Sequence, residues 1–230
     1  GALGITYSKT ALKEGLKKNP EIIVIDGGST DSGPAYLGQG ISKYSRSTTK
    51  AEWKTLMEAR ASLKIPLVIG SAGTCGTNSS VDWFLNITKE LAKELGQRPK
   101  IAVLKCSQSK TTIKNALKKG QLKPLQYAPP ITEERIQSCT NIVGLAGVEQ
   151  ITTAINTGAD IIIAGRSTDA SLIASYPILK GVEKGIAWHG GKIGECGAFC
   201  STNPKTGVIL ISFDKKGFTV EPMEKDAQAT

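Results

Sequence analysis

Aromatic side chains are scarce in this sequence of 230 residues, and the scarcity limits the classes of partner. Phe, Trp and Tyr make up only 5% of the residues. They do not alternate with the lysines, so the stacking platforms that bind single-stranded nucleic acid are missing. The sequence also contains no helix-turn-helix, zinc-finger or RNA-recognition signature. We therefore expect no nucleic-acid partner.

Long apolar runs and a secretory signal are also lacking. The longest apolar runs, such as Ile-Ile-Ile-Ala at 161–164, have the length of a strand and fall far short of the ~18 residues of a membrane span. The opening residues have neither the basic segment nor the apolar core of a signal peptide. Five scattered cysteines, an odd number, are typical of free thiols in a reducing compartment. We expect no membrane partner and a cytoplasmic location.

Basic residues are in excess. Twenty-nine Lys and Arg against 20 Asp and Glu give a net charge of +9, which favours anionic partners. Many of the lysines fall in a helix-like stretch at 110–119, where a solvated helix face is the expected arrangement.

Apolar, β-branched segments alternate with helix-like segments along the chain. Strands are predicted at residues 21–26, 65–69, 100–104 and 160–164. Capping residues and apolar spacing predict helices at 80–93, 111–119, from 132 onward and at 148–157. This alternation predicts an α/β fold, with a mostly parallel sheet and helices on both of its faces. Residues 207–213 and 217–221 predict an antiparallel hairpin on an edge near the C-terminus. No linker divides the chain, so residues 1–230 are expected to form a single α/β domain.

Three polar, glycine-rich loops follow predicted strands, at residues 26–34, 70–78 and 165–170. In a parallel sheet, ligands bind at the edge where the carboxyl ends of the strands meet. Glycines let backbone amides approach a ligand and hydroxyls add donors, which suits a carboxylate or a phosphate. The expected substrate-binding residues are Gly27, Gly28, Ser29, Thr30, Ser71, Gly73, Arg166, Ser167 and Thr168. Ordinary turns and helix caps are the alternative explanation of such loops.

Two of these loops have similar sequences. Ile-Asp-Gly-Gly-Ser-Thr-Asp at 25–31 matches Ile-Ala-Gly-Arg-Ser-Thr-Asp at 163–169. The repeat predicts that Asp31 and Asp169 point at one ligand, either as catalytic carboxylates or as ligands of a divalent metal. The alternative is a coincidence of turn or cap chemistry.

A fourth segment, at 187–200, contains the single histidine of the chain, His189. An unperturbed pKa near ~6.5 suits a histidine to proton transfer at neutral pH. In a helix, His189, Lys192 and Cys196 share one face and Glu195 lies close by. We therefore expect His189 and Glu195 to move protons and Lys192 to bind the charge of the substrate. The alternative is a packing role, with His189 at a helix end and the cysteines as small core residues.

Two familiar kinds of site are excluded, because the sequence has neither a nucleotide-binding glycine motif nor Gly-x-Ser-x-Gly. Cys196 and Cys200 with His189 also make a poor zinc pattern.

Three longer motifs are more distinctive. They are Gly-Ser-Thr-Asp-Ser-Gly-Pro-Ala-Tyr-Leu-Gly at 28–38, Ala-Gly-Arg-Ser-Thr-Asp at 164–169 and Ala-Trp-His-Gly-Gly-Lys-Ile-Gly-Glu-Cys-Gly-Ala at 187–198. With Pro-Leu-Val-Ile-Gly-Ser-Ala-Gly at 66–73, and in this order, they resemble the acyclic terpene utilisation (AtuA) family.

The resemblance implies an enzyme of small organic-acid or acyl-CoA catabolism, with a hydratase, dehydratase or related lyase as the expected reaction. The alternative is a non-catalytic metabolite-binding or assembly subunit. Family members carry a further strand and loop on the N-terminal side. We therefore expect this chain to be part of a larger protein or assembly, in which a second chain or a second copy covers an open sheet edge.

Overall fold

The computed structural model describes residues 3–4, 6–28, 35–204 and 207–230. Its centre is a parallel sheet of four short strands, β1 (Ile23–Asp26), β2 (Leu67–Gly70), β3 (Ile101–Leu104) and β4 (Ile161–Ala164). Their order across the sheet is β1-β2-β4-β3, with Ile25 opposite Ile69 and Ile69 opposite Ile163. The two inner strands are buried along their whole length, whereas the edge strands are mostly half-buried. This burial explains why the inner strands are continuous apolar runs.

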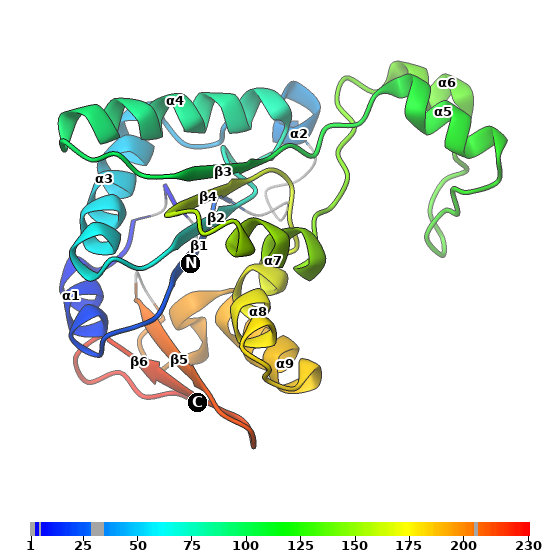
Figure 1. Cartoon of the computed structure of the whole chain (residues 1–230). Coiled ribbons are helices and arrows are strands. Elements are labelled where there is room, and N and C mark those ends of the chain that lie inside the picture. Colours follow the sequence, from blue (N-terminus) through cyan, green and yellow to red (C-terminus); the bar gives the residue numbers. More distant parts are fainter. Residues whose placement is uncertain (1–2, 5, 29–34, 205–206) are drawn as a thin grey trace.

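One face of the sheet packs against α1 (Lys9–Lys17), α3 (Arg46–Leu63) and α4 (Asn78–Glu94) (Figure 1). Ile161 and Ile163 of β4 point into this layer, because alternate side chains of a strand leave opposite faces. The indole N–H of the fully buried Trp53 on α3 donates to the hydroxyl of Thr88 on α4, at 3.0 Å. Trp53 therefore ties the two long helices together within the core.

The other face packs against α7 (Val148–Asn156) and α8 (Asp169–Leu179), where Ile162 of β4 meets Ile151 and Leu172. Helices thus cover both faces of a parallel sheet, as predicted. The next helix, α9 (Lys184–Gly194), lies close against α8, because a Cβ on Gly191 would be 2.6 Å from the carbonyl oxygen of Ala170. A 3-10 turn, η2 (Gly197–Cys200), follows α9.

The predicted hairpin forms from β5 (Ile209–Phe213) and β6 (Phe218–Pro222), with Ile211 opposite Val220. Its predicted position was wrong: it is a separate two-stranded sheet and does not pair with an edge of the main sheet. The side chains of the hairpin instead pack on α9, where a Cβ on Gly190 would be 2.5 Å from the ring of Phe213. Within the described residues, no strand pairs with the outer side of β1, where the amide of Leu3 donates to the carbonyl of Asp26.

Residues 105–145 leave the body between β3 and β4 and carry α5 (Lys110–Lys118) and α6 (Glu133–Ser138), which stand apart from the sheet in Figure 1. A bridge between Ser107 and Val143 holds the base of this segment. A short helix, α2 (Ala35–Gln39), follows β1 and precedes α3 along the chain.

Two further predictions concern cysteines and membrane spans. All five cysteines are free thiols, as expected. Among the described helices, none combines the length and the apolar character that crossing a membrane requires.

Candidate active site

The loops after β1, β2 and β4 meet at the carboxyl edge of the sheet. The amide of Gly27 donates to the carbonyl of Gly70 at 2.7 Å, and the amide of Ser71 donates to the carbonyl of Gly165 at 2.9 Å. The amide of Arg166 in turn donates to the carbonyl of Gly76 at 3.0 Å. The three polar loops therefore meet at one edge of the sheet within the residues that the structure describes.

The contact between the second and third loops requires a glycine. Gly76 has a φ of +63°, and a Cβ there would be 2.2 Å from the amide nitrogen of Arg166. Any side chain at position 76 would push the third loop away. Gly76 therefore sets the distance between the loops after β2 and β4.

Two hydroxyls of the predicted binding set have partners within the protein. Ser71 is fully buried, with a φ of +46°, and its hydroxyl accepts a hydrogen bond of 2.6 Å from Nη1 of Arg166. The hydroxyl of Ser167 donates to the carbonyl of Gly165 at 2.9 Å. Ser71 therefore joins the second loop to the third, whereas the Ser167 hydroxyl bonds within its own loop. The role of both serines toward a substrate remains a prediction.

Asp26, the last residue of β1, is the most unusual group at this edge. It is 8% exposed, and its Oδ1 finds no hydrogen-bond partner among the described residues. Burial, assisted by the negative charge of Asp169, raises the pKa of Asp26 from 3.8 to about 7, although Arg166 acts in the opposite direction. Asp26 is therefore a buried acid that changes its charge near neutral pH.

A cavity of about 1030 Å³ lies between β1, α1, α8, the residues after α9, and β5. Its charged end, beside the carboxyl end of β1, contains Asp26, Asp169, Lys192 and Glu195. Lys192 and Glu195 form an ion pair there. Other parts of the walls carry apolar side chains, Leu12, Leu16, Ile22, Ile23, Val24, Ile25, Ile173, Val208, Ile209 and Ile211, together with the charged side chains of Lys18, Glu21 and Lys180. The cavity therefore combines an acid–base cluster with a wall of mixed apolar and charged side chains.

The structure thus brings Asp169, Lys192 and Glu195 together at the charged end of this cavity, with Arg166 close enough to influence Asp26. His189 lies elsewhere: it is exposed and packs edge-on against Phe218, with 5.1 Å between the ring centroids. Cys196 does not share a helix face with it, because α9 ends at Gly194.

Thr168 is the N-cap residue of α8, and its hydroxyl is buried with no partner among the described residues. Gly28 and Gly73 have φ angles of +122° and +65°. Ser29, Thr30 and Asp31 lie outside the described residues, so the shared site of Asp31 and Asp169 stays a prediction. The described part of the chain has no group of three or more side chains that suit a metal ion.

Sequence analysis missed Asp26 as a site residue. In the second of the two similar loops, Ala164 stands at the position that corresponds to Asp26. The repeat therefore indicated Asp31 and Asp169 as site residues and not Asp26. The available signal was a carboxylate that ends a β-branched apolar run, where burial is expected.

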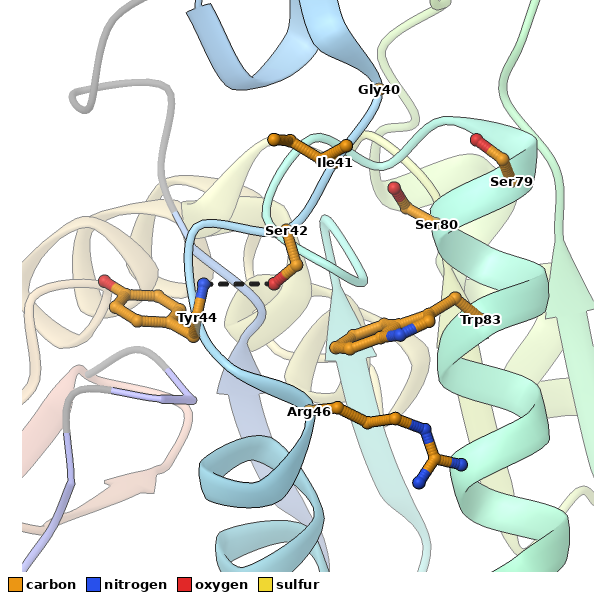
Figure 2. Close-up of a pocket in the computed structure, with 8 residues that line it drawn as sticks. All are labelled: Gly40, Ile41, Ser42, Tyr44, Arg46, Ser79, Ser80 and Trp83. Atoms are coloured by element: carbon orange, nitrogen blue, oxygen red, sulfur yellow. Dashed lines mark hydrogen bonds between the residues drawn. The ribbon is translucent and has the colours of Figure 1, made fainter.

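A second, smaller cavity of about 320 Å³ lies beside the first turn of α4 (Figure 2). The indole of Trp83 reaches from α4 toward the segment at 40–46, and Ser79 and Ser80 lie above it. The one charged side chain that lines it, Arg46, is paired with Glu90 at 2.5 Å. Among the described residues, no carboxylate lines this cavity, so it fits acid–base chemistry less well than the first.

The fold is that of an α/β protein whose loops converge at the carboxyl edge of a parallel sheet, which is the candidate ligand site. The model of the family described as acyclic terpene utilisation family protein AtuA matches residues 38–216. The chain belongs to this family, whose name indicates a catabolic role in acyclic terpene utilisation. No curated protein and no solved structure matches the chain significantly.

Proposed function

We propose that this chain carries the acid–base centre of a catabolic enzyme that adds water to, or removes water from, a small acyclic carboxylate or its acyl-CoA thioester. The substrate reacts at the charged end of the 1030 Å³ cavity. Membership of the acyclic terpene utilisation family supports a catabolic role, and the reaction and the acyl group are our inference.

The single observation that carries the proposal is the state of Asp26. A carboxyl group with a pKa of about 7 is partly protonated and partly ionised at neutral pH. It is therefore suited both to remove a proton next to a carbonyl and to return one to a departing hydroxyl. Among the described residues, no donor bonds to its Oδ1, which leaves that atom for a substrate.

The neighbouring groups have complementary tasks in this scheme. Burial raises the pKa of Asp26 most, the negative charge of Asp169 adds to that rise, and Arg166 limits it. Lys192 at the rim of the cavity supplies a positive charge for an anionic substrate group. Glu195, which pairs with Lys192, positions that charge.

The proposal is tested by binding and by turnover. Calorimetric titration with a ten-carbon acyclic isoprenoid carboxylate, and with its CoA thioester, should give saturable binding to the wild-type chain. Asp26→Asn should preserve that binding within a few-fold and abolish hydration or dehydration, followed by the ultraviolet absorbance of the unsaturated product. Asp82→Asn, which changes a carboxylate on α4 that pairs with Lys105, is the matched control and should leave both unchanged.

The alternative function is a non-catalytic metabolite-binding or assembly subunit. The exposed position of His189 favours it, because one expected proton carrier does not line the described cavities. His189→Ala separates the two: with catalysis at Asp26, turnover should survive this change. Ligand binding without turnover, in the wild type and in Asp26→Asn alike, would support the alternative.

A further inference from the structure

The smaller cavity, of about 320 Å³, has no task in the proposed acid–base function. Its volume is within the range of small-molecule sites, ~300–1,000 Å³. Its lining combines one indole, three serine hydroxyls and one guanidinium, and no carboxylate among the described residues (Figure 2). This combination suits a ligand that is flat and aromatic at one end and anionic at the other.

Trp83 supplies the aromatic surface of the cavity. The buried face of α4 consists of other residues, such as Val81, Phe84 and Ile87, and Trp83 beside them is only half-buried. Trp53 on α3, in contrast, is fully buried within the core. In Figure 2 the indole of Trp83 reaches from α4 into the space beneath the segment at 40–46. Flat rings such as nucleic-acid bases stack on an indole in such a position.

Two long helices begin at this cavity. α3 starts at Arg46 and α4 starts at Asn78, and Arg46 and Ser79, in their first turns, line the cavity. The N-terminus of a helix carries a partial positive charge, which an acidic residue in the first turn compensates in many proteins. Neither α3 nor α4 has an acidic residue there. The positive ends of both helices therefore add to the charge of Arg46 and favour an anion.

The guanidinium of Arg46 can turn toward an anion without leaving its present partner unpaired. Arg46 pairs with Glu90 at 2.5 Å, and its side chain is about half exposed. Glu90 also pairs with Lys50, at 2.9 Å, so it keeps an ion pair when Arg46 binds elsewhere. The planar fork of a guanidinium matches the geometry of a phosphate.

We propose that this cavity binds a purine nucleotide, with the base stacked on Trp83 and the phosphate held by Arg46 and the first turns of α3 and α4. A purine covers more of the indole than a pyrimidine does. Serine hydroxyls both donate and accept hydrogen bonds, so they suit the ring nitrogens and the ribose. The site differs from the glycine-motif sites that the sequence excludes, because helix ends and an arginine hold the phosphate.

The cavity is a neighbour of the candidate active site. The amide of Lys43 donates to the hydroxyl of Thr74 at 3.2 Å, and the amide of Thr74 donates to the carbonyl of Gly27 at 3.1 Å. Gly27 directly follows Asp26. Burial raises the pKa of Tyr44, which lines the cavity, and the charge of Asp26 raises it further. The two sites therefore lie side by side.

Two ligands present the proposed chemistry: a free purine nucleotide and the nucleotide end of CoA. With CoA, the nucleotide occupies the small cavity and the acyl group extends toward Asp26. This assignment to CoA rests on the proposed function, whereas the nucleotide site itself goes beyond it.

The probe is ADP, followed by calorimetric titration and by tryptophan fluorescence. We expect saturable binding that quenches the fluorescence. Trp83→Leu should weaken binding of ADP at least tenfold and abolish the quenching, because the base loses its stacking surface. Trp188→Leu is the matched control, since it changes a partly exposed indole on α9 that is not in the lining of the cavity, and it should leave the affinity unchanged.

A second variant tests the phosphate. Arg46→Gln should weaken binding of ADP at least tenfold and leave the weaker binding of adenosine, which has no phosphate, unchanged. Lys50→Gln removes the neighbouring cation that also pairs with Glu90, and it should leave the affinity for ADP within about twofold. Arg46 is exposed, so Arg46→Gln keeps the test decisive even if Trp83→Leu fails to fold.

The CoA thioester of a ten-carbon acyclic carboxylate identifies the source of the nucleotide. If the nucleotide belongs to CoA, the thioester should bind at least tenfold tighter than ADP, and Trp83→Leu should weaken binding of the thioester but not of the free carboxylate. Equal affinities for ADP and the thioester, with ADP and the free carboxylate bound together, would identify a free nucleotide. Both results support the nucleotide site.

Three outcomes would overturn the proposal. The first is a lack of saturation with both ADP and CoA at millimolar concentration. The second is an equal affinity for ADP in the wild type and Trp83→Leu. The third is an equal loss of affinity in Arg46→Gln and Lys50→Gln, because net charge alone would then explain the binding. Asp26→Asn should leave ADP binding unchanged, so a failure of the acid–base function remains distinguishable.

Discussion

The guanidinium of Arg166 donates a hydrogen bond of 2.6 Å to the hydroxyl of Ser71 and so joins the loop after β4 to the loop after β2. Arg166 also lowers the pKa of Asp26 by its charge. One side chain therefore holds two loops in place and adjusts the acid at the end of a third.

Arg166→Lys should weaken binding of the carboxylate ligand at least tenfold, about 1.4 kcal/mol. Lysine keeps the charge and loses the planar pair of donors that reaches Ser71 and an anion together. Calorimetric titration measures the effect, and Ser71→Ala is the companion variant, because it removes the loop contact and keeps the guanidinium. Equal affinity in wild type and Arg166→Lys would remove Arg166 from the site.

The raised pKa of Asp26 predicts an unusual dependence of stability on pH. The group has a pKa of 3.8 in an unfolded chain and about 7 in the folded protein. Between these values the folded state binds more protons, so the contribution of Asp26 to stability is complete below about pH 4 and is lost as the pH rises toward 7. The total loss is on the order of 4 kcal/mol.

Asp26→Asn removes this loss, so the variant should be more stable than the wild type at pH 8 and close to it at pH 4. Urea unfolding at both pH values measures the difference. Direct titration of the Asp26 carboxyl by carbon NMR provides the control. A midpoint below 5 would show that burial and Asp169 do not act as described.

Gly76→Ala should destabilise the protein far more than Gly96→Ala. Both glycines have a φ near +65°, so both substitutions carry the cost of a left-handed alanine. Only at Gly76 would the new Cβ meet the backbone of Arg166, whereas nothing lies within 4 Å at Gly96. We expect an additional cost of roughly 1–3 kcal/mol at Gly76 from overpacking, and a loss of ligand affinity there alone. Equal melting temperatures for the two variants would contradict the close contact between the loops.

Thr88→Val should lower stability by about 1–3 kcal/mol, because the buried indole N–H of Trp53 loses its acceptor. Valine has nearly the shape of threonine, so packing is preserved. Thr153→Val on α7 is the matched control, since its hydroxyl only bonds back to the carbonyl of Glu149 on an exposed surface. Thermal unfolding compares them, and a control that loses as much stability as Thr88→Val would refute the role of the Trp53 bond.

The parallel sheet could be predicted from the sequence, because strands that are buried on both faces consist of short, β-branched apolar runs. It did not predict the long helix α3, for which the physical reason is visible. The buried face of α3 includes the polar residues Thr49, Glu52 and Arg60, which interrupt the apolar period. The hairpin was predicted correctly and its position was not, because the sequence of a hairpin does not indicate which surface of the protein it packs against.

The location of the candidate site could be predicted from the sequence, whereas only some of its residues could. Glycine-rich loops after strands indicated the carboxyl edge, and Asp169, Lys192 and Glu195 do line one cavity there. His189 was predicted as a site residue from its chemistry alone. Its contact with Phe218 could not be predicted, because that contact depends on how the hairpin packs. The pKa of Asp26 follows from burial and from a neighbour more than 140 residues away, which only the folded chain brings near.

The strand order β1-β2-β4-β3 has a consequence for biosynthesis. β4 lies between β2 and β3, yet it is the last of the four to leave the ribosome. Until residues 161–164 emerge, β3 has no neighbour in the sheet, and β2 has only β1. A nascent chain that pauses before this point exposes the apolar edges of β2 and β3, which favours aggregation and binding by chaperones.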